Sequence, residues 1–312
     1  MALNVGLPHI PDLVMCQIIR LLPTKDVVRM SFLSKQWEDV LSSVPVLDFD
    51  ECGERRPHNF DPDNYQQQQQ QQHVKFIDNI LTKYLELYEK DKHKESLEKF
   101  RLRMMYSSSD TAIVDKLLNN SFDRGVKELE ISLRVSKSNW NRAHAASYHC
   151  FCLSPTTLAN AKSLTTLKLE YMRIKESLKC DEMKLPESDT PLLPSLKIMS
   201  FKNVHFNFLY SLIRECPSIE HLSLISCSFD KAIVFVSTSS LKSLEAKYCK
   251  AGFLHVQDDA KTLESLTFVS TRMRCIMLGN THNLRHINIH SRQLKVQNFY
   301  ESSMFITRYD RP

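Results

Sequence analysis

A six-residue pattern, L-x-x-L-x-L with conservative apolar substitutions, constrains the fold of this 312-residue chain more than any other feature. The pattern begins at Leu97, Val126, Leu164, Leu196, Ile219, Leu241, Leu263 and Leu284. The last four intervals are 23, 22, 22 and 21 residues long. A period near 22 residues is typical of a solenoid, in which each repeat forms one structural unit and packs against the next.

The extended form L-x-x-L-x-L-x-x-N/C-x-L identifies the type of solenoid. Residues 219–229 match it at every apolar site, with Cys227 at the N/C position, and Cys249 fills that position in the next repeat. Met172 and Val204 take its place in two earlier repeats. The last two apolar positions of the six point to one side of a short strand, so parallel stacking buries them in one core. The pattern therefore resembles a leucine-rich repeat and predicts an α/β fold with parallel strands.

The positions between these apolar residues are expected to face outward on a concave surface. Polar residues at these positions in the later repeats are candidates for contact with a second protein. The candidates are Lys168, Glu170, His221, Ser223, Glu245, Lys247, Thr267 and Asn288.

The segments that return from one strand to the next fall into two classes. Apolar residues follow helical spacing in segments 111–122 and 206–217, and the second ends at Pro217. Segments 233–236, 253–256 and 275–278 are shorter and apolar, which predicts small second strands. Helical returns need more chain than extended ones, in agreement with the shortening period.

Residues 51–73 combine charges, prolines and seven consecutive glutamines. This composition buries little apolar surface, so we expect a low-complexity linker without a fold of its own. The residues that follow form an apolar stripe at helical spacing, which predicts an amphipathic helix that caps the first repeat. The stripe consists of Phe76, Ile77, Ile80, Leu81, Tyr84, Leu85 and Tyr88.

The first 50 residues predict three short helices. Pro11 starts the first and Pro23 ends it, and Thr24 can cap the second. The apolar positions of the first helix are Ile10, Leu13, Val14, Ile18, Leu21 and Leu22. Val27 and Val28 lie on the second helix, and Leu33, Trp37, Val40 and Leu41 on the third. A unit this small is marginally stable alone, so part of its apolar surface is available to a neighbour or a partner.

The segment "IPDLVMCQIIRLLPTKDVVRMSFLSKQWEDVLSSVPVLDFDE" resembles an F-box, as found in plant F-box proteins with leucine-rich repeats. The segments "SPTTLANAKSLTTLKL" and "LPSLKIMSFKNVHF" are similar to the same family. The resemblance divides the chain into an F-box at 1–50, the linker at 51–73 and a substrate-binding solenoid at 74–312.

The resemblance implies a substrate-recognition subunit of an SCF-type ubiquitin ligase that does no bond chemistry itself. The F-box would dock on a Skp-type adaptor of a cullin–RING ligase, and the repeats would capture an unidentified protein substrate. Family contacts with the adaptor correspond here to Ile10, Pro11, Val14, Ile18, Leu22, Pro23, Val27, Val28 and Trp37. Without a signal peptide or an apolar run of about 20 residues, we expect an intracellular protein of the nucleus and/or cytoplasm, with no membrane partner.

Several other classes of function lack the residues they need. The five glycines are too far apart for a phosphate-binding loop, and no nucleophile has a neighbouring base, so neither a cofactor nor an enzymatic activity is predicted. "HCFC" at 149–152, with His144, offers half of a metal site, but buried reduced thiols are the favoured interpretation and no metal is predicted. Seven basic and two acidic residues lie in 271–312, without the aromatic pattern of a nucleic-acid site.

Two alternatives stay open. The repeats could form a pocket for a small ligand on the concave surface, which would make the chain a receptor. They could also act as a protein-binding scaffold whose F-box has no role in a ligase.

Overall fold

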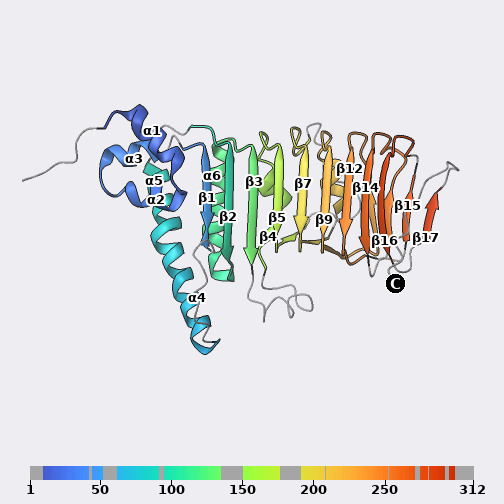
Figure 1. Ribbon diagram of the computed structural model, residues 1–312, viewed down its shortest axis with the longest axis horizontal. Coiled ribbons are helices and arrows are strands. Elements are labelled where there is room, and N and C mark those ends of the chain that lie inside the picture. Colours follow the sequence, from blue (N-terminus) through green and yellow to red (C-terminus); the bar gives the residue numbers. More distant parts are fainter. Residues whose placement is uncertain are drawn as a thin grey trace, which may run out of the picture.

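The structure is a computed structural model. It describes residues 10–41, 44–51, 62–90, 95–134, 150–175, 191–207, 209–251, 253–270, 275–279, 281–291 and 295–298. It confirms the α/β class: a helical unit lies at one end of a long stack of parallel strands (Figure 1). In these ranges, no helix combines the length and hydropathy needed to cross a membrane.

The main sheet contains nine parallel strands in the order β1-β2-β3-β5-β7-β9-β12-β14-β16. They are β1 (Val46–Asp50), β2 (Lys99–Met105), β3 (Glu128–Arg134), β5 (Thr166–Glu170), β7 (Ile198–Lys202), β9 (His221–Ile225), β12 (Ser243–Lys247), β14 (Ser265–Ser270) and β16 (His286–Ser291). Eight of them arise at the eight predicted repeats, so the solenoid is confirmed.

Strand β1 was not predicted, because its sequence was interpreted only as the end of the F-box. It carries the same pattern, since Val44, Leu47 and Phe49 occupy the three apolar positions and are all buried. Its residues pair in parallel with β2, from Val46 beside Lys99 to Asp50 beside Arg103. The division at residue 50 stays a prediction, but residues 46–50 are part of the repeat sheet.

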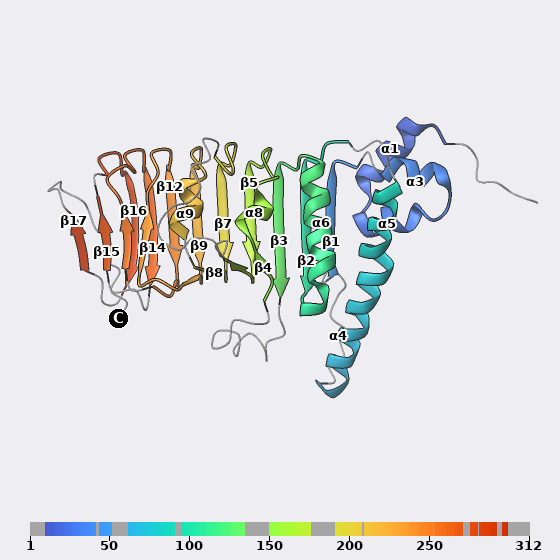
Figure 2. The ribbon, with the colours of Figure 1, turned by 180° about the vertical axis from the view of Figure 1, so that it is seen from behind.

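The second layer of the solenoid changes along its length. Helices α6 (Thr111–Asp123), α8 (Pro155–Leu158) and α9 (Leu209–Arg214) lie behind the first part of the sheet (Figure 2). A parallel back sheet of β11 (Ile233–Val236), β13 (Phe253–Val256), β15 (Cys275–Leu278) and β17 (Lys295–Asn298) follows. Two-residue strands β4 (Cys152–Leu153), β6 (Arg173–Ile174), β8 (His205–Phe206) and β10 (Ser228–Phe229) form a third small sheet. Both classes of predicted return segment are confirmed.

The turns after β5, β7, β9 and β12 share one backbone feature. Tyr171, Asn203, Ser226 and Tyr248 have positive φ values between 53° and 59°. The amide of each donates to a main-chain carbonyl within the last two residues of the next main strand, as Tyr248 does to Val269. The residue directly after each of these four enters the core. After Tyr248 this residue is Cys249, whose thiol donates to the Leu224 carbonyl at 3.3 Å. Cys227 and Cys249 therefore fill the N/C position with a thiol that donates to the preceding repeat, whereas Met172 and Val204 fill it with buried apolar side chains.

The glutamine run differs from the expectation of an unfolded linker. Helix α4 (Pro62–Phe76) contains it, and a π-helical turn (Ile77–Leu81) and α5 (Thr82–Lys90) continue the same helical run. The predicted stripe covers the first strand, with Phe49 and Tyr84 ring centroids 5.2 Å apart. His73 fixes the glutamine helix, because its two ring nitrogens lie 3.1 Å from carboxylate oxygens of Glu51 and Asp110. Sequence composition did not predict this helix, because its anchor is one histidine that contacts two residues distant in sequence.

Candidate functional site

The first candidate surface lies on the three N-terminal helices, α1 (Asp12–Leu21), α2 (Thr24–Met30) and α3 (Lys35–Leu41). Helix α1 uses Met15 and Ile19 to contact the core, with 0% and 2% of their surfaces exposed. Leu13 and Leu21 on the same helix are 81% and 85% exposed. Burying such side chains gains about 1.5–3 kcal/mol each, so these two leucines favour a partner on this face.

The nine residues predicted to contact an adaptor fall into three groups of different accessibility. Pro11, Val14 and Pro23 are exposed. Ile10, Ile18 and Leu22 are partly buried and pack against the core. Val27, Val28 and Trp37 are fully in the core, with no more than 7% of their surfaces exposed. In the structure, Val27, Val28 and Trp37 therefore hold the three helices together.

Two exposed apolar residues outside the predicted adaptor contacts lie between α2 and α3, and one of them, Leu33, was wrongly predicted to lie on the third helix, which begins at Lys35. Phe32 is 51% exposed and Leu33 is 63% exposed. The ammonium group of Lys83, on α5, lies 5.2 Å from the centroid of the Phe32 ring. The sequence signal was available, since "SFLSKQW" places two large apolar residues among polar ones, but spacing alone did not show which side they face.

The helical unit is attached to the repeat sheet by buried polar contacts. The Thr24 hydroxyl accepts from the Asp48 amide at 2.8 Å, which joins α2 to β1. Arg124 is 4% exposed, and its guanidinium donates to the Val44 and Glu95 carbonyls at 2.8 and 2.9 Å. Because one continuous core runs through both parts, the position of the helices relative to the sheet is fixed.

The second candidate surface is the outward face of the main sheet. Strand register places five of the eight predicted residues in one row, namely Lys168, Ser223, Glu245, Thr267 and Asn288. Glu170 and Lys247 lie in the next row toward the strand ends, and His221 lies in the row before. Neighbouring strands are about 4.8 Å apart, so the part from Ser223 to Asn288 spans about 14 Å. The structure thus brings the predicted residues onto one continuous face.

Several of these side chains already interact with one another. Glu245 accepts from the Ser223 hydroxyl at 2.6 Å and lies 2.5 Å from the Lys247 ammonium. The hydrogen bond from Lys247, and then that from Ser223, lower the pKa of Glu245. Glu170 pairs in the same way, since it accepts from Ser132 at 2.9 Å.

Sequence reasoning missed the charged residues on the first strands of the same face. The row of Lys168 continues through Glu130 and Arg101 to Asp48, with charges that alternate in sign. Arg101 donates to Asp48 through two nitrogens, one at 2.6 Å. Arg103 donates to Glu130 at 2.5 Å. These residues occupy the same outward positions of the repeat pattern, but the predicted contacts were confined to the later repeats.

The sequence-predicted half of a metal site gains no support. His144 and His149 lie outside the described residues, and no group of three His, Cys, Asp or Glu is placed to hold a metal in the ranges given above. Cys150 and Cys152 lie two residues apart, and the Cys152 thiol donates to the Cys150 carbonyl at 3.7 Å. The Cys150 side chain is the main cause of a lowered pKa of Cys152, which is about 6.

Comparison with known families identifies both parts of the chain. The F-box domain model matches residues 7–49. The model described as FBD-associated F-box protein At5g56370, LRR repeats, matches residues 114–303. The chain belongs to this family. The recognition from sequence is therefore confirmed.

Curated relatives of this F-box family member come from Arabidopsis thaliana. The F-box/FBD/LRR-repeat protein At2g26030 is 26% identical over 91% of the chain and 57% of its own length. The F-box/LRR-repeat protein At3g59210 is 27% identical over 77% of the chain and 43% of its own length. F-box/LRR-repeat protein 13 is 28% identical over 82% of the chain and 47% of its own length. The chain spans about half the length of these relatives. No solved structure matches it.

Proposed function

We propose that the chain is the substrate-recognition subunit of an SCF-type ubiquitin ligase. The observation that supports this most is the pair of exposed leucines on α1, Leu13 and Leu21, in a helical unit that the F-box model matches. A Skp-type adaptor would bury this face and connect the chain to a cullin–RING ligase. The chain itself would do no bond chemistry, and the complex would work in the nucleus and/or cytoplasm.

The rigid attachment between helices and sheet supports the same role. A substrate receptor acts by tethering, which raises the local concentration of substrate lysines near the ubiquitin-conjugating enzyme. Tethering is most effective when the two binding faces keep one relative orientation. Here Arg124 and strand β1 fix that orientation.

The adaptor interaction is tested with the double variant Leu13→Arg plus Leu21→Arg. Central apolar contacts contribute about 2 kcal/mol each, so we expect affinity for a purified Skp-type adaptor to fall at least about 100-fold by calorimetry. Both side chains are exposed, so folding is unaffected. The matched control is Val74→Arg, which changes an exposed apolar residue of α4 and keeps full affinity. Equal binding by the double variant and the wild type would contradict the proposal.

For the substrate, we propose the outward face from β9 to β16. Asn288 and Thr267 lie in its central row. The variant Thr267→Arg plus Asn288→Arg should lose captured proteins while still binding the adaptor. Removing residues 1–50 is a poor alternative, because it deletes β1 and uncovers the core. The receptor for a small ligand and the scaffold without ligase role stay predictions.

A further inference from the structure

Two cysteines lie at the terminal strand of the small sheet β10-β8-β6-β4. Cys152 begins β4, and Cys150 precedes it by two residues. Phe151 and Leu153, which alternate with them, are buried in the core with 1% and 2% of their surfaces exposed. Residues two apart on an extended chain point to the same side, so the two thiols lie together. Cys152 is exposed and Cys150 is half-buried, so the interpretation of both as buried thiols is wrong.

The two thiols of this pair differ in charge. The Cys150 side chain is the main cause of the lowered pKa of Cys152, and the Cys152 side chain is the main cause of a raised pKa of Cys150. Such a coupled pair releases one proton near neutral pH and keeps the other. The exposed thiol therefore carries the negative charge at pH 7, and the half-buried thiol stays protonated.

Two cations face Cys152 from β6 and from the residue that follows it. Arg173 is the register partner of Cys152, and Lys175 comes directly after this strand. After Cys150, Lys175 and then Arg173 lower the pKa of Cys152, whereas burial opposes them. The thiolate is the nucleophilic form of cysteine, and neighbouring cations stabilise it. Cys152 therefore has the exposure and the charged surroundings of a reactive thiol.

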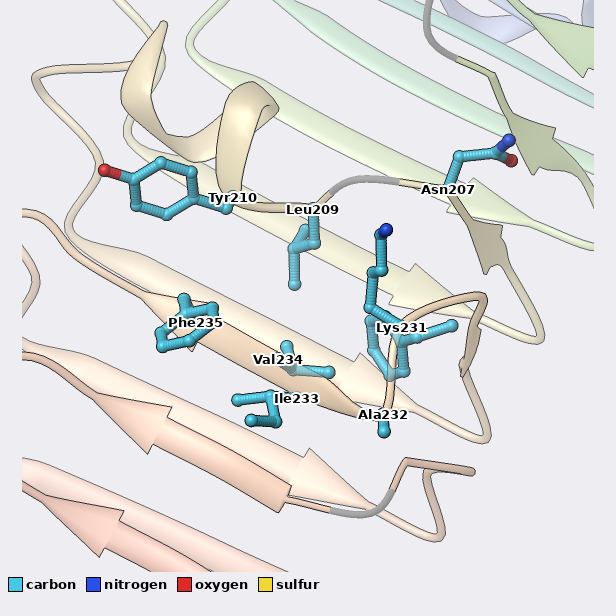
Figure 3. Close-up of a pocket in the computed structure, with 9 residues that line it drawn as sticks. Asn207, Leu209, Tyr210, Lys231, Ala232, Ile233, Val234 and Phe235 are labelled. Atoms are coloured by element: carbon cyan, nitrogen blue, oxygen red, sulfur yellow. The ribbon is translucent and has the colours of Figure 1, made fainter. Parts of the chain in front are cut away.

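The side chain of Arg173 is held in place by two partners. Its Nε donates to the side-chain oxygen of Asn207 at 3.2 Å, and its guanidinium lies 3.6 Å from a carboxylate oxygen of Asp230. Asn207 lies at one end of a pocket of about 420 Å³ beside β11, where α9 and the back sheet meet (Figure 3). With 13% of its side chain exposed, Arg173 is a fixed cation beside Cys152.

We propose that Cys152 and Cys150 form a site of reversible oxidation by hydroperoxides. The Cys152 thiolate attacks the peroxide O–O bond, which gives a sulfenic acid on Cys152 and releases hydroxide or an alkoxide. The Cys150 thiol then attacks the Cys152 sulfur, an S–S bond forms, and the sulfenic oxygen leaves as water with the Cys150 proton. The peroxide gains two electrons, and the two thiols lose them to become one disulfide.

The spacing of the two cysteines makes this disulfide easy to reduce again. A strand rises about 3.3 Å per residue, so the two Cα atoms are about 6.6 Å apart if the chain is extended. Disulfides usually join Cα atoms about 4.4–6.8 Å apart, so this one is near the upper limit. Strained disulfides are the ones that other thiols reduce readily. The site does not depend on adaptor or substrate binding, so its test and those of the proposed function fail separately.

The test treats the reduced full chain with hydrogen peroxide at pH 7 and then blocks the remaining thiols with N-ethylmaleimide in urea. Trypsin releases both cysteines in one peptide, residues 143–162. We expect this peptide to become lighter by two hydrogen atoms and to take up no N-ethylmaleimide, and dithiothreitol should restore both thiols. Cys216 is the internal control and should stay reduced, because it is buried and its thiol donates to the Leu212 carbonyl at 3.1 Å.

Two matched variants separate the roles of the cysteines. In Cys150→Ser, oxidation should stop at the sulfenic acid of Cys152, which dimedone traps. In Cys152→Ser, Cys150 should stay reduced at the same peroxide concentration, because it is half-buried and lacks the thiolate. Oxidation of both variants to the same extent would contradict these roles.

The wild type alone also tests the proposal. Alkylation of Cys152 by iodoacetamide should slow about tenfold between pH 7 and pH 5, whereas an ordinary thiol slows about 100-fold. A 100-fold change would overturn the proposal. So would a wild-type peptide that keeps both thiols while glutathione in a parallel sample is oxidised, or one that carries a sulfinic acid and no disulfide.

Discussion

The two halves of the solenoid are built from the same strand pattern but differ in what surrounds it. Strands β1 to β5 carry charged outward residues that pair across strands, as Arg101 and Asp48 do, and long helices cover their ends and back. Strands β9 to β16 carry mostly serine, threonine, asparagine and histidine, and a second sheet backs them. The difference indicates that the first half holds the helical unit in place, whereas the outward face of the second half is available to bind a partner.

This contrast follows from how polar groups are satisfied. In the first half, buried or half-buried polar groups form closed sets, such as His73 with Glu51 and Asp110. In the second half, Asn288 and His221 lie exposed on the outward face. Closed polar sets add rigidity, and exposed polar rows add potential contacts at little cost to stability.

Arg124→Ala gives the largest expected effect on the first half. The change leaves the Val44 and Glu95 carbonyls without a donor in the core and opens a cavity beside Tyr84. Each unsatisfied buried group costs about 1–3 kcal/mol, so the free energy of unfolding should fall by about 4 kcal/mol. Urea unfolding of the full chain measures it.

The matched change in the second half is Ser240→Ala. Ser240 is half-buried and donates one hydrogen bond to the Ile219 carbonyl at 2.8 Å. Its loss should cost about 1 kcal/mol. Equal costs for Arg124→Ala and Ser240→Ala would contradict the contrast between a fixed half and a looser one.

His73 predicts a pH dependence that belongs to the first half alone. The hydrogen bond to Asp110, then that to Glu51, raise the pKa of His73 from 6.5 to about 9. A raised histidine pKa stabilises the fold fully below pH 6.5, and the contribution is lost as pH rises through 9. The difference between these two pKa values limits the contribution of His73 to the free energy of unfolding to roughly 3 kcal/mol. Partial solvent access reduces this contribution to about 2 kcal/mol.

The acidic side of this profile depends on Asp110. Burial raises the pKa of Asp110 and the hydrogen bond with His73 lowers it, with a net lowering below 3.8. Its contribution is therefore present above pH 3.8 and is lost as pH falls through the lowered pKa. Thermal unfolding of wild type and His73→Gln between pH 2 and pH 10 measures the difference. A constant difference across this range would contradict the role of His73.

The repeat strands were predictable because their signal is local. Each needs only apolar residues at three positions of six, and the eight predicted occurrences all became strands. The same rule would have found β1, had Val44, Leu47 and Phe49 been read as a repeat rather than as part of the F-box.

The parts that were not predictable depend on contacts between distant residues. The glutamine helix needs His73 to reach Glu51 and Asp110, which are 22 and 37 residues away in sequence. Helical spacing assigned Leu13 and Leu21 to the apolar face of the first helix and left out Ile19, but Ile19 enters the core and the two leucines are exposed. The pocket beside β11 arises from the meeting of two back layers, which no single repeat contains.

Tyr248 gives the smallest predicted effect and tests the turns of the second half. Its φ of 56° lies in the left-handed region, which asparagine tolerates better than other non-glycine residues and β-branched residues tolerate worst. Tyr248 is 55% exposed, so replacing its ring loses little packing. We expect Tyr248→Asn to raise the free energy of unfolding by about 0.5 kcal/mol and Tyr248→Val to lower it by about 1 kcal/mol. Urea unfolding of both variants measures the two signs. Because substitutions at one position share the same loss of the ring, opposite signs can come only from the backbone, and equal signs would show that the side chain, not the turn, sets the stability there.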